Sequence, residues 1–385
     1  MPDRATHVVM LVRNAYTHDS RVKKEASSLL GAGYRVTVVA DAAPGLPERE
    51  HRDGTDVVRV PRSAPAIPGL RFLLHQWKLA RSLREQRPAI LHAHDSNALI
   101  PVALAARALG IPYVYDAHDL WLGRPRRERS RLYFALSQLT YRLIERLLIP
   151  RAAATLTVSP PIVEHLRRRY RLRNVALVPN YPELPDVVTP RELRGLASLP
   201  DLPIALYLGG LMAGRGLEEL VDAVAMLPSV QLVALGEGVL ADELRDRAEG
   251  AGAANRVHIL PPVPPDEVIP FAASADLGIS PILPFSLNSQ FSLPNKLFQY
   301  MAAGIPVVAS DLPQVRAVLD GARCGIVVDT TRPAAIAHAI SEVLADPAEA
   351  RAMGQRGAHA VAERHRWQIS AGILLGVYAE LRPPT

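Results

Sequence analysis

One segment of the chain combines glycines with an arginine in a way that suits contact with phosphate. Residues 209–216 read Gly-Gly-Leu-Met-Ala-Gly-Arg-Gly and follow an apolar run at 204–208. Glycine lets a backbone approach a ligand closely, and the guanidinium of Arg215 can neutralise a diphosphate through paired hydrogen bonds. A plain turn between a strand and a helix accounts for the same glycines, so this segment alone leaves both interpretations open.

A second segment, residues 291–308, is the most informative in the chain. It reads FSLPNKLFQYMAAGIPVV. Pro294 predicts the first turn of a helix, Gly304 predicts its end, and a buried strand should follow. The N–H groups that a helix leaves free at its N-terminus are well suited to phosphate. Gln299 would lie one to two turns into this helix, where its amide can reach a ribose hydroxyl.

Two further turns follow apolar runs in the same half of the chain. Gly236, Glu237 and Gly238 come after the run at 230–235 and open a helix. Residues 261–263 read Pro-Pro-Val, a rigid turn whose backbone groups can hold the edge of a base. A simple loop explains that turn equally well.

In the first half of the chain, histidine and aspartate gather where two predicted strands end. His94 and Asp95 end one strand, and His118 and Asp119 follow the next. Polar groups at the carboxyl ends of parallel strands are candidates for acceptor binding or catalysis. Histidine and aspartate also bind metals, but no i, i+4 pair and no cysteine accompanies them here. We therefore expect no metal at this site.

These segments need a framework of strands and helices to position them. Short apolar runs alternate with amphipathic helices, which is typical of a parallel sheet covered on both faces. The series occurs twice, so the sequence predicts two doubly wound α/β units. The predicted strands lie at 7–12, 35–40, 57–60, 89–93, 112–116, 155–158, 204–208, 230–235, 257–260, 277–280, 307–309 and 326–328.

The expected domain boundaries follow from this repetition. A length of 385 residues suits two domains. We expect an N-terminal domain at 1–182, a linker rich in proline and polar residues at 183–203, and a C-terminal domain at 204–366. A final amphipathic helix should occupy most of 367–385.

Composition narrows the class of protein. The single cysteine, Cys324, excludes a disulfide within the chain and reads as a small buried hydrophobe. No run approaches the roughly 18 apolar residues of a membrane span, and the apolar run at 8–12 is too short for the core of a secretory signal. We expect a cytoplasmic protein.

The net charge of +6 favours anionic partners. Two basic clusters, 124–131 and 167–173, contain five arginines each. They are consistent with peripheral contact at the inner, anionic face of a membrane, and equally with solvated arginines. Proteins that bind nucleic acid usually interleave aromatic with basic residues. Aromatic residues make up only 5% of this chain, so we expect no nucleic acid.

Taken together, these segments resemble family 4 glycosyltransferases of the GT-B fold. Residues 294–308 are similar to the family signature in its Pro-Asn-Lys-Leu-Phe-x-Tyr-Met-Ala-Ala-Gly form, and segments 19–26, 115–119 and 209–216 match in the same order. The resemblance covers essentially the whole chain. It implies two Rossmann-like domains that face each other across a cleft, with the last helix crossing back to the N-terminal domain.

The family also implies an activity. A sugar moves with retention from a nucleotide-diphosphate sugar, held mainly by the C-terminal domain, to a glycan, lipid-linked or small-molecule acceptor, held mainly by the N-terminal domain. No metal or other cofactor is expected. Arg215 and Lys296 would stabilise the leaving diphosphate, and His118 would contact the transferred sugar.

The resemblance assigns binding residues as well. The expected donor-binding residues are Gly209, Gly210, Gly236, Glu237, Pro262, Val263, Phe291, Ser292, Leu293, Pro294, Asn295 and Gln299. The expected acceptor-binding residues are Asn14, Asp19, Arg21, His94, Asp95 and Asp119.

Several positions depart from the family pattern. The family often has two glutamates separated by seven residues, where this chain has Phe291 and Gln299. Gln299 can still hydrogen-bond a ribose, whereas Phe291 cannot replace a carboxylate. Gly210 stands where an arginine is frequent, and Arg215 replaces a lysine but keeps its charge. These differences bear on the donor sugar more than on the reaction.

Two other functions fit the same residues. A nucleotide-sugar epimerase shares the two-domain fold and acts on the donor without an acceptor, so it would give a product of unchanged mass. A non-catalytic nucleotide-sugar binder is in keeping with the missing glutamates, and it would bind nucleotide without turnover.

Overall fold

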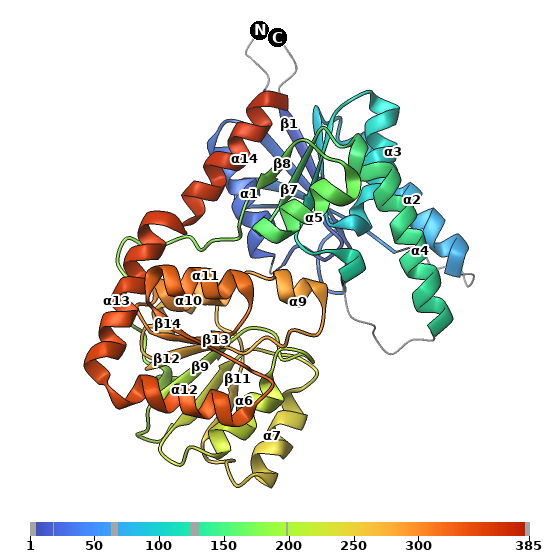
Figure 1. Ribbon diagram of the computed structural model, residues 1–385. Helices are drawn as coiled ribbons and strands as arrows, with labels where there is room; N and C mark the ends of the chain where they lie inside the picture. Colours follow the sequence, from blue (N-terminus) through green and yellow to red (C-terminus); the bar gives the residue numbers. More distant parts are fainter. Residues whose placement is uncertain (1–4, 18, 63–67, 124–130, 198, 382–385) are drawn as a thin grey trace. The chain divides into compact units, whose positions relative to one another are not determined.

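The computed structural model describes residues 5–17, 19–62, 68–123, 131–197 and 199–381. The chain divides into two compact units: unit 1 comprises Met1–Asn180 and Ser370–Thr385, and unit 2 comprises Tyr181–Ile369. In each unit helices flank a sheet that is wholly or mostly parallel (Figure 1). The prediction of two Rossmann-like α/β domains is confirmed.

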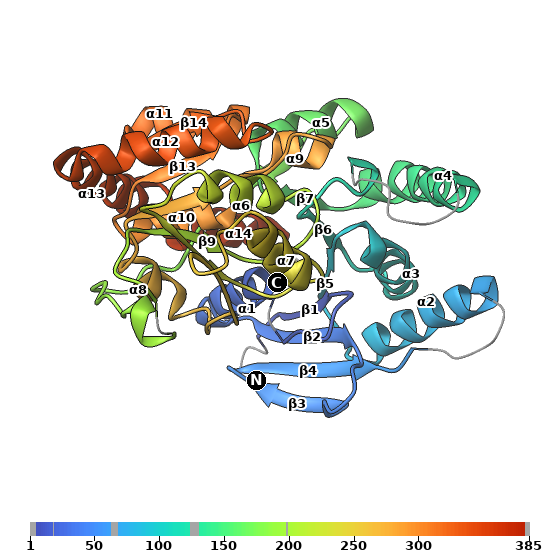
Figure 2. The ribbon, with the colours of Figure 1, turned by 90° about the horizontal axis from the view of Figure 1, so that it is seen from below.

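Unit 1 contains an eight-stranded sheet in the order β3-β4-β2-β1-β5-β6-β7-β8, with β3 at one edge (Figure 2). All neighbouring strands are parallel except the β3–β4 hairpin. The strands are β1 (His7–Leu11), β2 (Arg35–Asp41), β3 (Arg49–Arg52), β4 (Thr55–Val60), β5 (Ile90–His94), β6 (Tyr113–Ala117), β7 (Ala154–Thr157) and β8 (Val175–Leu177).

Amphipathic helices connect these strands. In α1 the carboxylate of Asp19 caps the helix by accepting from the Val22 amide at 3.2 Å, and Val22, Ala26 and Leu29 are buried. The helices of unit 1 are α1 (Ser20–Gly31), α2 (Pro68–Glu85), α3 (Leu99–Leu109), α4 (Arg131–Leu148), α5 (Pro160–Tyr170) and the part of α14 (Trp367–Leu381) from Ser370 onward; short 3-10 turns lie at Ser96–Ala98, Trp121–Gly123 and Ile149–Arg151.

Two strands of this sheet were not predicted. β3 reads Arg-Glu-His-Arg and is mostly exposed, so it carries no apolar signal. β8 is only three residues long. A 3-10 turn at Ser96–Ala98 precedes α3.

Unit 2 contains a six-stranded, wholly parallel sheet in the order β11-β10-β9-β12-β13-β14. Its strands are β9 (Ile204–Leu208), β10 (Gln231–Leu235), β11 (Val257–Leu260), β12 (Leu277–Ser280), β13 (Val307–Ser310) and β14 (Gly325–Val328). Its helices are α6 (Leu217–Ala225), α7 (Ala241–Gly250), α8 (Val268–Ala272), α9 (Leu287–Phe291), α10 (Asn295–Ala302), α11 (Pro313–Ala322), α12 (Pro333–Ala345) and α13 (Pro347–Arg364), with a 3-10 turn at Leu193–Gly195. Two clusters of buried apolar side chains form the core of this unit.

The segment predicted as a linker, 183–203, is part of unit 2. Leu193 is fully buried in one of the apolar clusters of that unit, and its amide donates to the Ser274 hydroxyl at 3.0 Å. The Arg191 amide donates to the carbonyl of Pro270 at 2.9 Å. The segment therefore packs on α8 and belongs to the core of unit 2. At the other end of unit 2, α14 begins at Trp367, but from Ser370 onward it belongs to unit 1.

Candidate active site

In unit 2 the predicted donor residues surround the point where the strand order reverses. β9 has β10 on one side and β12 on the other, so the chain leaves β9 and β12 in opposite directions. In open α/β sheets, ligands bind beyond the carboxyl ends of the strands at such a point. The loop Gly209–Gly216 follows β9, and the segment that leads to α10 follows β12.

Glycines let three strand-end loops pack backbone to backbone. A Cβ atom at Gly216 would lie 1.8 Å from the Pro281 carbonyl oxygen, and Gly216 has φ of +68°. A Cβ atom at Gly236 would lie 2.0 Å from the Gly209 carbonyl oxygen. Only glycine fits at either contact. The ends of β9, β10 and β12 are therefore held in one compact group.

Lys296 and Arg215 provide the positive charge of this group. The Nζ atom of Lys296 lies 3.6 Å from the centre of the Tyr207 ring and beside Gly209. Burial, with a contribution from the nearby charge of Arg215, lowers the pKa of Lys296 well below its usual value. Among the residues that the structure describes, neither cation has a carboxylate partner. Two neighbouring cations without a counter-ion favour an anion at this point.

Tyr300, a residue that was not predicted from the sequence, fixes α10 at the reversal point. Its hydroxyl accepts from the Leu208 amide at 2.9 Å and donates to the Ile279 carbonyl at 3.0 Å, so it joins β9 to β12. It is fully buried. The only hint in the sequence is its place inside the 294–308 segment, two turns after Pro294, which is the N-cap of α10 rather than its first residue.

The other predicted donor residues are placed unevenly around this group. Glu237 is exposed, and its carbonyl accepts from the Leu211 amide at 2.9 Å, next to Gly210. Phe291 is the last residue of α9. Ser292, Leu293 and Pro294 are half-buried and connect α9 to α10, and Gln299 lies half-buried in α10. Pro262 and Val263 follow β11, two strands away from β9, and no described contact links them to Arg215 or Lys296.

In unit 1 a charged network occupies the ends of β5 and β6. Arg21 donates to the carboxylate of Asp116 from Nε at 3.0 Å and from Nη2 at 3.1 Å, and from Nη1 to the Val178 carbonyl at 2.7 Å. His118 Nε2 lies 2.9 Å from Asp116 Oδ2 and 3.2 Å from His94 Nδ1. Asp116 is thus held by two cations.

The charges in this network shift the pKa values of its members. Burial lowers the pKa of His118, but Asp116 and Asp95 outweigh it and raise the pKa to about 9. Burial alone would raise the pKa of Asp116, and Arg21 and His118 bring it well below the usual value. Burial and the repulsion from His118 lower the pKa of His94. At neutral pH, His118 is therefore an imidazolium beside a carboxylate.

Two of the predicted acceptor residues, Arg21 and His94, do not fit that role. Both side chains are buried, and all three nitrogens of the Arg21 guanidinium group are used inside the protein. The sequence could not show this, because a basic residue in the first turn of an amphipathic helix normally faces solvent. We assign Arg21 to the positioning of Asp116, and His94 to the support of His118.

The remaining predicted acceptor residues lie at the same sheet edge. Asn14 is exposed and donates to Asp19 at 2.8 Å. Asp95 accepts from the His118 amide at 3.1 Å and has φ of +65° and ψ of 165°, a conformation that costs a non-glycine residue energy. Asp119 is exposed. Strain of this kind is concentrated at functional sites, and it marks Asp95 as the strongest candidate of the four remaining residues.

Two further residues, Glu25 and His92, extend the network into the interior of unit 1. Both are fully buried, with Glu25 Oε1 2.9 Å from Arg21 Nε and Glu25 Oε2 3.9 Å from His92 Nε2. Burial, opposed by Arg21, raises the pKa of Glu25 to about 8. His92 Nδ1 hydrogen-bonds at 2.7 Å to the hydroxyl of Tyr378, which lies on α14. The final helix therefore contributes a buried side chain to this network.

Glu25, His92, His94 and Asp116 each offer a ligand atom within 4.8 Å of the others, which is close enough to hold a metal ion. The guanidinium of Arg21 lies 2.9 Å from the carboxylates of both Glu25 and Asp116. A fixed cation between the two acids opposes the binding of a second cation. The residues fit a balanced ionic network better than a metal site, and a metal-free reaction stays our prediction.

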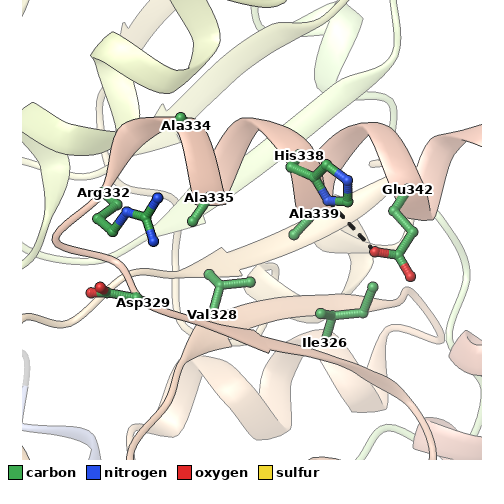
Figure 3. Close-up of a pocket in the computed structure, with 9 residues that line it drawn as sticks. All are labelled: Ile326, Val328, Asp329, Arg332, Ala334, Ala335, His338, Ala339 and Glu342. Atoms are coloured by element: carbon green, nitrogen blue, oxygen red, sulfur yellow. Dashed lines mark ion pairs between the residues drawn. The ribbon is translucent and has the colours of Figure 1, made fainter.

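A separate pocket of about 490 Å³ lies elsewhere in unit 2, between β14 and α12 (Figure 3). Its lining includes Ile326, Val328 and Arg332, with His338 and Glu342 3.8 Å apart on α12. None of the predicted site residues lines it. It lies against the edge strand of the sheet, away from the reversal point between β9 and β12.

Comparison with known proteins agrees with this arrangement. Residues 19–181 match the glycosyl transferase 4-like domain, and residues 202–346 match the glycosyl transferases group 1 domain. The chain is 26% identical to alpha-D-kanosaminyltransferase of Streptomyces kanamyceticus, over 94% of this chain and 98% of the relative. It is 27% identical to phosphatidyl-myo-inositol mannosyltransferase of Mycobacterium leprae, over 93% and 91%.

A solved structure shares the fold of this chain. Sucrose-phosphate synthase of Thermosynechococcus elongatus superposes with a TM-score of 0.82 at 20% identity, over 98% of this chain and 99% of that one. With one glycosyltransferase domain in each half and a GT-B architecture throughout, the chain belongs to the family 4-like glycosyltransferases of the GT-B fold.

Proposed function

We propose that this protein is a retaining glycosyltransferase that moves a sugar from a nucleotide-diphosphate sugar to a hydroxyl group of an acceptor. The observation that carries the proposal is the pair of cations Lys296 and Arg215 beside the glycine loop of β9, without a described carboxylate partner. A diphosphate supplies the charge that this pair lacks.

The chemistry follows from where charge develops. When the glycosidic bond to the phosphate breaks, negative charge builds on the leaving nucleoside diphosphate. Arg215, Lys296 and the N-terminal end of α10 can stabilise that charge. We assign no covalent nucleophile. The acceptor hydroxyl oxygen bonds to the anomeric carbon from the face that the diphosphate leaves, and the hydroxyl proton passes to the departing phosphate oxygen.

His118 takes the role of a charged hydrogen-bond donor. Its imidazolium is held by Asp116 on one side and its backbone by Asp95 on the other. Its side chain stays partly open to solvent while Asp116 is fully buried. We assign His118 to a hydroxyl of the transferred sugar, and Asn14, Asp95 and Asp119 to the acceptor.

The names of the relatives indicate the range of acceptors to test. One relative is named for transfer to phosphatidyl-myo-inositol, a lipid, and another for transfer of a kanosaminyl group. We propose a glycan, lipid-linked or small-molecule acceptor for this chain. We also propose that the enzyme acts in the cytoplasm and needs neither a metal nor another cofactor.

The test is to incubate the protein with nucleotide sugars and candidate acceptors, follow nucleotide release, and determine the anomeric configuration of the product by NMR. Product with the configuration of the donor supports the proposal. Inversion would rule out the retaining mechanism, isomerised donor of unchanged mass would indicate an epimerase, and binding without release would indicate a non-catalytic binder.

Arg215→Ala provides the internal check on the site. It should lower turnover by roughly 10²-fold, the usual cost of losing one donor that stabilises a transition state. Arg245→Ala is the matched control, because Arg245 is an exposed arginine of the same unit that pairs with Asp242. Equal rates for the two variants would contradict the role of Arg215.

A further inference from the structure

Helix α4 of unit 1 is amphipathic, but its leucine-rich face is exposed to solvent. Four leucines spaced three or four residues apart, Leu136, Leu139, Leu143 and Leu147, face solvent, with Leu139 64% and Leu143 58% exposed. On the protein side, the buried carboxylate of Glu145 accepts from Ser96 at 2.7 Å and from the Tyr170 hydroxyl. A surface helix normally buries its apolar stripe, so these leucines are left without a partner in the described structure.

Helix α2 repeats this feature. Leu70, Leu73, Leu74 and Trp77 recur at helical spacing on its exposed side, and Trp77 is 57% exposed. The same helix buries Leu79 and Leu83 against unit 1. The exposed stripe is therefore additional to the stripe that holds the helix in place.

Helix α3 lies between the other two. It packs against both α2 and α4, and the three helices run side by side in Figure 2. Its Leu104 is 53% exposed. Three neighbouring helices thus each expose apolar side chains, and we call the exposed faces of α2, α3 and α4 together the helix surface. Soluble monomers rarely expose apolar groups so close together unless the groups bind something.

The charge of the helix surface is strongly positive. Among the described side chains of α2, α3 and α4, the exposed acidic residue is Glu85, which pairs with Arg81 at 2.8 Å. The exposed basic residues are Arg71, Lys78, Arg81, Arg84, Arg107, Arg142 and Arg146. Leucines and a tryptophan bordered by arginines and lysines match the two parts of an anionic bilayer, its acyl chains and its head groups.

We infer that the helix surface binds anionic membrane, and that the protein lies on the bilayer through α2, α3 and α4. Among the described residues, no helix is long and apolar enough to cross a membrane, so contact from one side is the mode that fits. This inference goes beyond the proposed function and does not depend on it, because lipid binding requires neither donor nor acceptor.

Other occupants fit less well. A second copy of the chain would bring seven exposed cations against their own counterparts, and like charges oppose such a contact. Nucleic acid would use the cations, but it leaves the aliphatic leucines of α4 without a role. The two basic clusters noted in the sequence are not part of the described charge of the helix surface. Residues 124–130 lie outside the described structure, and 167–173 lie on and after α5.

The test uses the full-length protein with vesicles of phosphatidylcholine alone or with about 30% phosphatidylglycerol, to supply the negative surface potential. We expect sedimentation with the anionic vesicles, weakening as salt is raised. Dibrominated acyl chains should quench the fluorescence of Trp77, and Trp77→Phe should remove most of that quenching.

Variants separate the apolar from the charged contribution. Leu139→Ser with Leu143→Ser should weaken vesicle binding by about tenfold or more, because two exposed side chains lose their transfer out of water. Val187→Ser with Val239→Ser, which alters two exposed apolar residues of unit 2, is the matched control and should bind as the wild type does. Arg142→Gln with Arg146→Gln should reduce binding and its salt dependence, whereas Arg351→Gln should not.

Three results would overturn the inference. One is equal binding of the wild type and the leucine variant to anionic vesicles. Another is a wild-type dimer in sedimentation velocity that the leucine variant converts to monomer, because the surface would then be covered by a second copy. The third is binding to single-stranded RNA in preference to vesicles. If the leucine variant misfolds, the arginine variants and Trp77 quenching still decide the question.

Discussion

The imidazole of His118 lies 2.9 Å from the carboxylate of Asp116, and that same carboxylate accepts two hydrogen bonds from Arg21. The buried acid thus keeps one cation fixed inside unit 1 and a second, His118, at its surface. Because Asp116 is fully buried, its charge acts through a medium that screens poorly. His118 therefore stays protonated over the neutral range and is oriented before any ligand binds.

Asp116→Asn should lower the pKa of His118. The wild-type imidazole should titrate near pH 9, because Asp116 and Asp95 outweigh burial. The variant loses the largest acidic contribution to the pKa of His118, so this pKa should fall toward 6.5. NMR titration of the His118 ring protons measures this. An unchanged His118 midpoint would show that Asp116 does not hold its charge.

The same pair makes a signed prediction for stability. A histidine whose folded pKa is raised from 6.5 to about 9 stabilises the fold fully below pH 6.5 and loses that contribution as pH rises through 9. The difference in free energy of unfolding between wild type and His118→Gln should therefore be constant below pH 6.5 and shrink between pH 6.5 and 9. Urea titrations across that range measure it, and a difference that grows with pH would contradict the assignment.

Glu25→Gln should remove a second pH dependence. The folded pKa of Glu25 is raised from 4.5 to about 8, so the folded state keeps a proton that the unfolded state releases. In the wild type this lowers stability as pH rises from 4.5 to 8. Glutamine cannot ionise, so the variant should lose less stability over that interval. Melting temperatures compared at pH 5 and pH 8 test this prediction. An equal decrease in melting temperature for both proteins would show that Glu25 is not the group that holds the proton.

Gly216→Ala should destabilise unit 2 by about 2 kcal/mol or more, because the methyl group meets the Pro281 carbonyl and the residue has a positive φ. Gly321→Ala in α11 is the control, since its Cβ would meet nothing within 4 Å. That change should be neutral or stabilise by about 0.5–1 kcal/mol. Similar effects of the two substitutions on denaturant unfolding would mean that the loops are not packed as described.

Transfer should proceed without metal. Arg215 and Lys296 supply positive charge for the leaving diphosphate, and Arg21 lies against both carboxylates of the cluster of potential metal ligands found among the described residues. Nucleotide release should therefore be the same after extensive treatment with EDTA as before it. A loss of activity that Zn²⁺ or Mg²⁺ restores would show that a cation acts in the reaction.

Much of the framework could be predicted from the sequence because its strands are buried on both faces. All five residues of β1, β5, β6, β9 and β10 are buried, and such strands read as continuous apolar runs. β3 could not be predicted, because an exposed edge strand of four polar residues carries no period.

The candidate residues of unit 2 could be predicted from the sequence more completely than those of unit 1. Arg215, Lys296 and the glycines follow strands directly, so their grouping at the carboxyl end of the sheet was predictable. The role of Glu25 was not, because it follows two lysines in a helix and reads as a solvated charge. Only folding shows that it is buried next to His92, a residue 67 positions away, and that Tyr378 reaches the same place from the end of the chain.

The most direct test of the central claim is the binding of nucleoside diphosphates, compared with the corresponding nucleosides, to wild type, Lys296→Met and Arg215→Ala by isothermal titration calorimetry. We predict that one nucleoside diphosphate binds the wild type, that its nucleoside binds far more weakly, and that each substitution reduces the diphosphate affinity by about tenfold or more, as expected for a lost charge-assisted contact. Arg245→Ala should bind like the wild type. Wild-type affinity in both variants, or no binding of any nucleotide, would contradict the assignment of Lys296 and Arg215 to the donor diphosphate.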